Sequence, residues 1–237
     1  MKKSSYPFET IGIVHSPFKE KFGTPRQPGL IKQTLFSIEM LAPYDCDEAF
    51  DGLDNFSHLW ISFIFHQNKN KPWSPKVRPP RLGGNQRVGV FASRSPYRPN
   101  PIGLSVVELT GLRRKQGKLF IDIKGADLIE GTPVVDIKPY VPYADCVVEA
   151  KGGYATTLPT SKLNVQFSDK AAQKIIEVAV DYPDLKTLIE QVLELDPRPA
   201  YLSGTDDKVQ YGIKLLDFDI RWETEGDEVL VLSLESI

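Results

Sequence analysis

Short runs of alternating apolar residues, separated by loops rich in proline and glycine, dominate the first two thirds of this chain. Leu59, Ile61, Phe63 and Phe65 alternate with other residues, and a period of two is typical of a strand with one buried face. Comparable runs occupy residues 9–15, 34–41, 87–92, 102–109, 119–124 and 133–137. Many short strands joined by such turns predict an antiparallel β-barrel or sandwich, and a closed sheet also has no exposed edges.

The pattern changes after residue 160. Ser168 can cap a helix that runs to about residue 180. A second helix is expected from an apolar stripe at helical spacing, formed by Leu185, Leu188, Ile189, Val192 and Leu193. Alternating runs at 209–215 and 218–222, and a turn at 225–227, predict a closing hairpin. These elements predict a small α+β unit.

We therefore expect a mainly β chain with two domains. The first is an antiparallel β-barrel at residues 1–145, and the second is a small α+β domain at residues 161–237. Residues 146–160 have weak periodicity and include a Gly-Gly pair, so we interpret them as a linker.

The charge is unevenly distributed along the 237 residues. The formal net charge of -2 suggests no polyanionic partner. However, residues 55–107 contain no Asp or Glu but eight basic residues. Such a stretch can be a solvated basic face or a folded anion-binding surface. Because it also contains apolar strands and many prolines, we interpret it as a folded anion-binding surface.

Composition and missing motifs exclude several classes of protein. An apolar share of 41% with 25% charged residues excludes a disordered or fibrous chain. Cys46 and Cys146 form no CxxC pair and there are three histidines, so no metal site is expected. No apolar run is long enough for a signal peptide or a bilayer span, so we expect a cytoplasmic protein and no membrane partner. The sequence has no GxG, Walker A, HExxH or GxSxG motif.

Two polar features lie next to predicted strands. The loop at residues 24–29 combines Arg26 and Gln27 with two prolines and a glycine, and a proline-stiffened loop loses less entropy when it orders around a ligand. His66 and Gln67 end an apolar strand, where a polar pair can line a pocket. A plain surface turn and a solvent-facing strand end are the alternatives.

The loop at residues 94–101 is the strongest single signal. It places Arg94, Tyr97 and Arg98 among three prolines. Arginine binds phosphate and stacks on bases, and tyrosine stacks too. The loop therefore indicates contact with RNA or phosphate, and a stiff exposed loop without a ligand is the alternative.

Acidic residues gather in two further loops. Asp127 and Glu130 lie beside Gly and Thr, shortly before Asp136, and such carboxylates can balance a cationic ligand or accept bonds from ribose hydroxyls. The segment Asp196 to Tyr201 joins an acid, a base and an aromatic residue. A capped turn and a simple helix stop are the alternatives.

Six blocks together resemble one family. In order they are IGIVHSPFKEKFGTPRQPG, FSHLWISFIFH, VRPPRLGG, GVFASRSPYRPNPIGLS, DLIEGTPVVDIKPY and DPRPAY. They are similar to the TrmO family of tRNA methyltransferases. The resemblance implies an S-adenosylmethionine-binding β-barrel and a homodimer. It also implies methylation of the exocyclic N6 nitrogen of threonylcarbamoyladenosine, beside the anticodon in the tRNA anticodon loop.

The resemblance also implies residue roles. The matching cofactor contacts are Arg26, Gln27, Pro28, His66, Gln67, Arg94, Leu104, Asp127, Leu128, Ile129 and Glu130. The residues we assign to tRNA are Arg94, Tyr97, Arg98, Arg198 and Tyr201. The target nitrogen is a poor nucleophile until its proton leaves, and a carboxylate within hydrogen-bond reach can take that proton. Asp196 is the first candidate for this catalytic role and Asp136 the second.

Two other classes remain open from the sequence. One is a non-catalytic RNA-binding β-barrel, which explains the basic stretch but not the acidic turn at residues 127–130. The other is a hydrolase of an adenine-containing small molecule.

Overall fold

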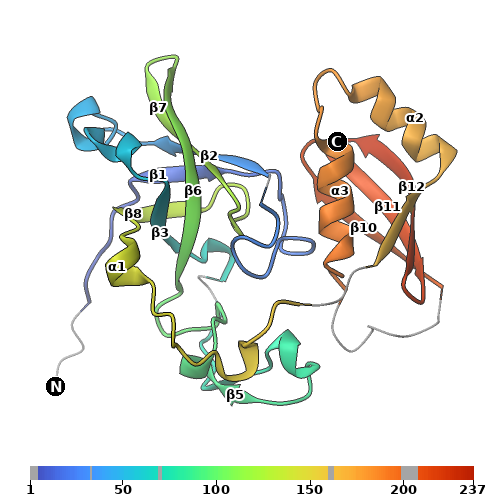
Figure 1. The fold of residues 1–237 in the computed structure, drawn as a ribbon, viewed down its shortest axis with the longest axis horizontal. Coiled ribbons are helices and arrows are strands. Elements are labelled where there is room, and N and C mark those ends of the chain that lie inside the picture. The colour runs from blue at the N-terminus through green and yellow to red at the C-terminus, as the bar shows by residue number, and fades with distance from the viewer. Residues whose placement is uncertain (1–4, 33, 69–70, 160–162, 199–207) are drawn as a thin grey trace.

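Six antiparallel strands close into a barrel in the first half of the chain. The computed structural model describes residues 5–32, 34–68, 71–159, 163–198 and 208–237. Around the barrel the strands follow the order β1, β2, β7, β6, β3, β8 (Figure 1). Their bounds are β1 (Gly12–His15), β2 (Leu35–Met40), β3 (His58–Ile64), β6 (Ile102–Lys115), β7 (Lys118–Lys124) and β8 (Pro133–Pro139). The predicted mainly β class is confirmed.

Alternating apolar side chains fill the barrel. Leu59, Ile61 and Phe63 of β3 point inward and are buried, as the period of two predicts. Phe63 also explains why residue 103 is a glycine. A Cβ atom at Gly103 would lie 2.2 Å from the Phe63 ring, so any larger residue would displace that ring.

All the loops that carry the barrel's predicted site residues leave it at one end. Neighbouring strands run antiparallel. The ends of β1, β3 and β7 therefore lie beside the starts of β2, β6 and β8. The connections at 16–34, 65–101 and 125–132 all begin or end there.

The connection at residues 65–101 forms a lobe of its own. It contains a two-stranded sheet of β4 (Lys76–Val77) and β5 (Val88–Gly89). The predicted strand at 87–92 is therefore too long, because β5 ends at Gly89 and a 3-10 turn, η5 (Val90–Ala92), follows. Phe91 and Ala92 are both exposed, so no buried face continues the strand.

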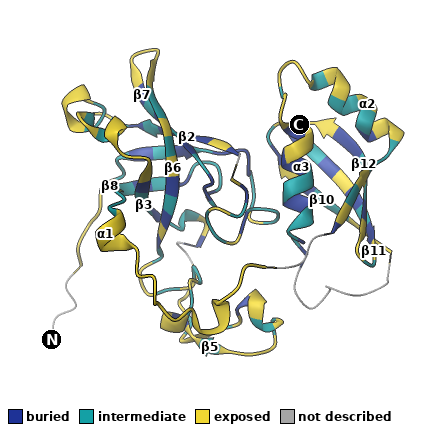
Figure 2. Ribbon diagram, viewed as in Figure 1, coloured by how far each residue is buried: buried dark blue, intermediate teal, exposed yellow. Residues whose placement is uncertain are grey.

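Short helical turns connect the remaining elements. They are η1 (Asp47–Phe50), η2 (Leu53–Asn55), η3 (His66–Asn68), η4 (Pro80–Leu82), α1 (Pro142–Asp145) and η6 (Gly153–Ala155). Figure 2 shows that exposure concentrates on the β4–β5 lobe, α1 and the tip of the β6–β7 hairpin.

A four-stranded sheet with two helices forms the C-terminal part. The strand order is β10, β11, β12, β9, in which β9 is parallel to β12 and the other pairs are antiparallel. The bounds are β9 (Asn164–Phe167), α2 (Asp169–Val178), α3 (Leu185–Glu194), β10 (Val209–Leu215), β11 (Phe218–Glu225) and β12 (Glu228–Ser236). β9 was not predicted from the sequence.

Both predicted helices are confirmed. Ser168 is the N-cap of α2, where its side chain accepts a bond from the Ala171 amide at 3.2 Å. The five apolar residues of the α3 stripe are all buried. Pro183 lies just before the N-cap of α3, Asp184.

The segment after β1 joins the two parts. Phe18 forms a β-bridge with Leu215, and the Leu216 amide donates to the Pro17 carbonyl at 2.7 Å. Gly23 has a φ of 82°, and a Cβ atom there would lie 2.0 Å from Ile213. Figure 1 shows this segment in dark blue between the barrel and the C-terminal part. Their apolar residues form one continuous core.

The described residues show neither a membrane-spanning helix nor a cluster of metal ligands. None of their helices has the length and apolar character that a membrane crossing requires. They also contain no group of three or more His, Cys, Asp or Glu side chains placed to hold a metal ion.

Candidate functional site

Three of the predicted site segments meet at the loop-bearing end of the barrel. The Arg94 guanidinium donates to the Gln27 side-chain oxygen at 2.5 Å. The Gly29 amide donates to the Gly125 carbonyl at 2.8 Å. These bonds bring the loop at 24–29 against both the 94–101 loop and the turn that precedes Asp127.

Asp127 lies on the inner side of this meeting point. Its Oδ1 accepts a bond from the Ser105 hydroxyl at 2.6 Å, and Ser105 is buried in β6. Burial raises the pKa of Asp127, while the Ser105 bond and the charge of Arg94 oppose that rise. A carboxylate held in a desolvated place favours a cationic ligand that restores its lost solvation.

His66 and Gln67 belong to η3, which directly follows β3. The Phe65 amide donates to the Pro101 carbonyl at 2.8 Å, which holds η3 beside the start of β6. His66 is partly buried and Gln67 is exposed. Burial lowers the pKa of His66, and the nearby charge of Lys21 lowers it further. The imidazole is therefore neutral at neutral pH.

Leu104 and Asp136 lie in one row on the outer face of the barrel. Ser62 of β3 pairs with Leu104 of β6 on one side and with Asp136 of β8 on the other. Directly paired residues point to the same face. Leu104 is 53% exposed, and the Asp136 carboxylate is also exposed, with bonds from Lys138 and from the Ile137 amide.

The side chains of residues 127–130 have different surroundings. Leu128 is buried in the core and Ile129 packs against it. The Glu130 carboxylate faces elsewhere, because it accepts bonds from the Ser16 amide at 2.7 Å and from the His15 ring at 3.2 Å. The side chains of Leu128 and Glu130 are thus engaged within the fold, and the backbone of this turn remains a candidate contact for a cofactor.

Asp196 and Arg198 form a buried ion pair directly after α3. Asp196 Oδ1 accepts from Arg198 Nε at 2.7 Å, and Oδ2 accepts from Nη2 at 2.9 Å. Asp196 is 5% exposed and Arg198 is 2% exposed. The predicted contact between Arg198 and tRNA phosphates does not fit the structure, because the guanidinium faces Asp196 and is shielded from solvent. Because both carboxylate oxygens of Asp196 accept bonds from Arg198 and the side chain is buried, this carboxylate is poorly accessible as a base.

This pair is connected to the cofactor loop. Arg26 Nη2 donates to the Arg198 carbonyl at 3.0 Å, across 172 positions of sequence. The end of α3 therefore lies beside the 24–29 loop. Tyr201, the remaining residue that we assigned to tRNA in this segment, lies outside the described residues.

The lobe at residues 65–101, which we call the basic lobe, exposes most of its lysine and arginine side chains to solvent. Lys71, Lys76, Arg78, Arg81, Arg87 and Arg94 are exposed. Arg98 differs, because its guanidinium donates to the Val90 and Ser93 carbonyls at 3.2 and 2.7 Å. Arg98 thus stabilises the conformation of its own loop. The predicted contact with tRNA would use the guanidinium N–H groups that do not donate to these carbonyls. Tyr97 is partly exposed beside Lys71, whose Nζ lies 5.8 Å from the ring centre.

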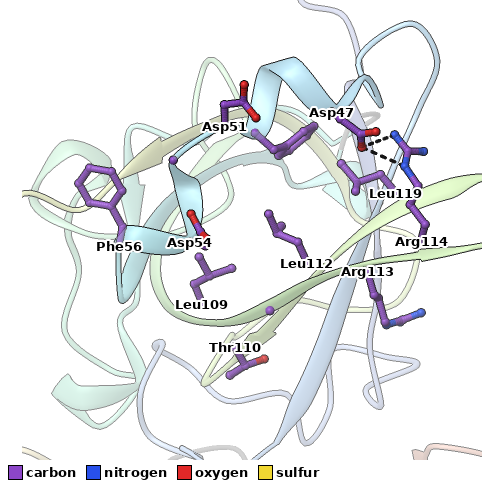
Figure 3. Close-up of a pocket in the computed structure, with 13 residues that line it drawn as sticks. Asp47, Asp51, Asp54, Phe56, Leu109, Thr110, Leu112, Arg113, Arg114 and Leu119 are labelled. Atoms are coloured by element: carbon purple, nitrogen blue, oxygen red, sulfur yellow. Dashed lines mark hydrogen bonds and ion pairs between the residues drawn. The ribbon is translucent and has the colours of Figure 1, made fainter.

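A cavity of about 650 Å³ lies at the opposite end of the barrel. It is lined by η1, η2 and the hairpin of β6 and β7, and Figure 3 shows Asp47 bonded to Arg114 at its rim. None of the predicted site residues lines it. The cavity is therefore separate from the place where the predicted segments meet.

The structure adds residues that the sequence reasoning missed. Ser105 holds Asp127, and Lys21 lies beside His66. Both lie in blocks that resemble the family, since Lys21 precedes the Arg26 loop and Ser105 ends the block that contains Arg94. Their position within those blocks was the available signal.

Family models cover nearly all of the chain. The model of the tRNA-methyltransferase O N-terminal domain matches residues 13–146, and that of the TrmO C-terminal domain matches residues 160–237. The chain belongs to the TrmO family. The two matched segments correspond to the barrel with its loops and to the four-stranded sheet with its two helices.

Individual TrmO-family proteins agree with this. An Escherichia coli K12 protein named tRNA (adenine(37)-N6)-methyltransferase is 45% identical over 98% of this chain and 99% of its own. A Pseudomonas aeruginosa relative is 46% identical over 90% of each chain, and its name provisionally assigns it to the S-adenosylmethionine-dependent methyltransferases. A crystal structure of TrmO from Pseudomonas aeruginosa superposes with a TM-score of 0.80 at 38% identity, over 100% of this chain and 99% of the other.

Proposed function

We propose that this protein is an S-adenosylmethionine-dependent tRNA methyltransferase that modifies the N6 nitrogen of adenosine 37, beside the anticodon. The E. coli relative with this name matches over the full length of both chains. The observation that carries the proposal is the meeting of three family blocks at one end of the barrel, through the bonds of Gln27 with Arg94 and of Gly29 with Gly125. The substrate nucleoside that we propose is threonylcarbamoyladenosine.

The residues at the meeting point suit the cofactor. S-adenosylmethionine supplies an electrophilic methyl group on a sulfonium, and it carries an amine, a carboxylate and an adenine. Asp127 offers a carboxylate to the cationic groups, and the Gln27 amide and nearby backbone offer hydrogen bonds. Arg26, Pro28, His66, Gln67 and Leu104 complete the proposed set, together with the backbone of residues 128–130.

The protein's work is then mainly orientation and proton removal. Holding two reactants in line can contribute on the order of 7–11 kcal/mol to the barrier reduction. We propose Asp136 as the proton acceptor, because its carboxylate is exposed and lies in the same outer row as Leu104. Asp196 is second, because the ion pair with Arg198 occupies it.

The assembly and the division of labour are also part of the proposal. The barrel at residues 1–145 binds the cofactor, residues 146–160 connect, and residues 161–237 support the tRNA side. The protein acts in the cytoplasm as a homodimer, in which a second copy covers the outer row around the exposed Leu104. The exposed cations of the basic lobe, with Arg94 and Tyr97, contact the anticodon stem and loop.

Binding of the cofactor is expected to stabilise the protein. At 100 times the dissociation constant, a ligand adds about 2.7 kcal/mol to the free energy of unfolding. At about 2–4 °C per kcal/mol for a chain of this size, the melting temperature should rise by about 5–10 °C. Differential scanning calorimetry measures this, with ATP as the control nucleotide. No shift at millimolar S-adenosylmethionine would favour a non-catalytic RNA-binding protein or a hydrolase.

Substrate identity needs a direct assay. The protein is incubated with the cofactor and with tRNA from cells that lack the modification, and the nucleosides are analysed by mass. The expected product is N6-methylated threonylcarbamoyladenosine. An unchanged nucleoside profile would argue against the proposed reaction.

The basic lobe is expected to set the salt dependence of tRNA binding. Each lost phosphate contact lowers the slope of log affinity against log salt by about one. The double variant Arg78→Ala/Arg87→Ala, which removes two exposed cations of the lobe, should therefore lower that slope by about two. Arg221→Ala is the control, because Arg221 lies in β11 and pairs with Asp219. Equal slopes for the wild type and the double variant would remove both arginines from the interface.

A further inference from the structure

Positive charge gathers beside the proposed cofactor site without an acidic partner. Lys21 follows β1 in the loop that also carries Arg26, and its Nζ donates to the Asn68 side-chain oxygen at the end of η3. His66 begins the same turn. The charge of Lys71 acts on Lys21, and that of Lys21 acts on His66, which places the three groups close together.

No protein carboxylate balances this cluster within the described residues. None of their ion pairs includes Lys21 or Lys71. Two of the three groups, His66 and Lys71, lie in the stretch without any Asp or Glu. Both lysines are exposed, so a ligand can reach their ammonium groups. Partial burial and the charge of Lys71 lower the pKa of Lys21.

Asn68 adds an independent sign of a missing acceptor. It is 3% exposed, and its Nδ2 has no hydrogen-bond partner in the described part of the chain. A buried donor without an acceptor is costly. Nδ2 belongs to the same planar amide whose Oδ1 accepts the bond from Lys21, so the unpaired donor and the Lys21 ammonium belong to the same polar cluster. A carboxylate has two acceptor oxygens, so one ligand group can accept from both kinds of donor.

We propose that Lys21, Lys71 and the Asn68 amide form an anion subsite that takes a carboxylate of one of the two reactants. The inference rests on the proposed function, under which two carboxylates enter this region. One belongs to the methionyl part of the cofactor, and the other to the threonyl group of the target base. The subsite adjoins His66 and the Arg26 loop, where the cofactor and the base meet.

Removing the Lys21 charge tests the subsite. Isothermal titration calorimetry compares wild type and Lys21→Met with S-adenosylmethionine and with methylthioadenosine, which lacks the carboxylate. If the subsite takes the cofactor carboxylate, Lys21→Met weakens S-adenosylmethionine binding by about tenfold or more and leaves methylthioadenosine binding unchanged. Lys170→Met, an exposed lysine of α2, is the matched control.

A second experiment tests whether the bound carboxylate belongs to the threonyl group of the target nucleoside. In that case the variant binds S-adenosylmethionine normally, and its KM rises about tenfold for tRNA with threonylcarbamoyladenosine. Its affinity for the same tRNA with plain adenosine then stays at the wild-type value. Equal weakening toward both tRNAs would instead indicate a backbone phosphate and overturn the proposal, as would no change in either arm. Wild-type protein that binds no S-adenosylmethionine would count against the proposed function and not against the subsite.

Two further variants sharpen the result. Lys21→Arg keeps the charge and should restore most of the binding. Asn68→Asp places an internal carboxylate beside Lys21, so it should mimic the bound ligand and weaken binding of the carboxylate-bearing reactant by about tenfold. Wild-type affinity in both Asn68→Asp and Lys21→Met would overturn the proposal, and the melting temperature shows that each variant is folded.

Discussion

Replacing Asp127 with asparagine is expected to weaken S-adenosylmethionine binding while making the free protein more stable. The Asp127 carboxylate lies in a desolvated place where Ser105 and the charge of Arg94 compensate it only in part. Losing a charge-assisted interaction with a cationic ligand costs about 1.5–3 kcal/mol, or roughly tenfold to a hundredfold in affinity. Titration calorimetry with the cofactor measures this directly.

The stability gain follows from the direction of the pKa shift. Burial raises the folded-state pKa of Asp127 above its ordinary value of 3.8. The folded protein therefore binds this proton more tightly than the unfolded chain does. The stabilisation from the protonated side chain is complete below pH 3.8 and is lost as the pH rises through the raised folded-state pKa. Asparagine stays neutral, so Asp127→Asn should melt above the wild type at pH 7, and the difference should vanish in acid.

Asp122→Asn provides the matched control for Asp127. Asp122 lies in the adjoining β7 strand and pairs at the surface with Arg113 at 2.8 Å. Its neutralisation should change neither cofactor affinity nor the pH profile of stability by much. A folded Asp127→Asn variant with wild-type affinity would show that Asp127 does not face the cofactor. A lower melting temperature at pH 7 would show that the ionised carboxylate stabilises the free fold.

The sequence predicted the barrel strands well because their signal is local. In β3 the alternation of Leu59, Ile61 and Phe63 follows directly from one buried face. The predicted length of the strand at 87–92 was wrong because its apolar residues do not form one buried face: Val90 is buried whereas Phe91 is exposed. β9 escaped prediction because its short segment shows a weak pattern by itself and is ordered by parallel pairing with the distant β12.

The candidate site was predictable as a set of segments but not as a set of contacts. The blocks that contain Gln27, Arg94 and Asp127 do meet in the structure. What each side chain does there depends on partners far away in sequence. Glu130 faces His15 across 115 positions, and no local pattern reveals such a pairing. Arg98 is committed to carbonyl groups of its own loop, which charge counting along the chain does not show.

Breaking the buried ion pair after α3 is expected to cause the largest loss of stability. Asp196→Asn keeps the size of the side chain and tolerates the φ of 48° at this position, but it leaves the Arg198 guanidinium buried without its countercharge. Arginine is not deprotonated in proteins, so the guanidinium stays charged in the variant. Removing one partner of such a pair costs about 3–5 kcal/mol, or roughly 6–20 °C in melting temperature.

The chain contains a matched surface pair for comparison. Asp219 and Arg221 have the same spacing and the same 2.7 Å contact, but their side chains are more exposed. Asp219→Asn should therefore cost less than about 1 kcal/mol. The double variant Asp196→Asn/Arg198→Met should regain much of the loss, because no uncompensated charge remains buried.

The same variants separate a structural role for Asp196 from a catalytic one. If Asp196 mainly supports the 24–29 loop through Arg198 and Arg26, the activity of Asp196→Asn follows its folded fraction and returns at low temperature. If Asp196 is the base, turnover stays low in fully folded protein, and the stabilised double variant does not recover it. A melting temperature of Asp196→Asn equal to that of Asp219→Asn would show that burial of the pair adds nothing to its strength.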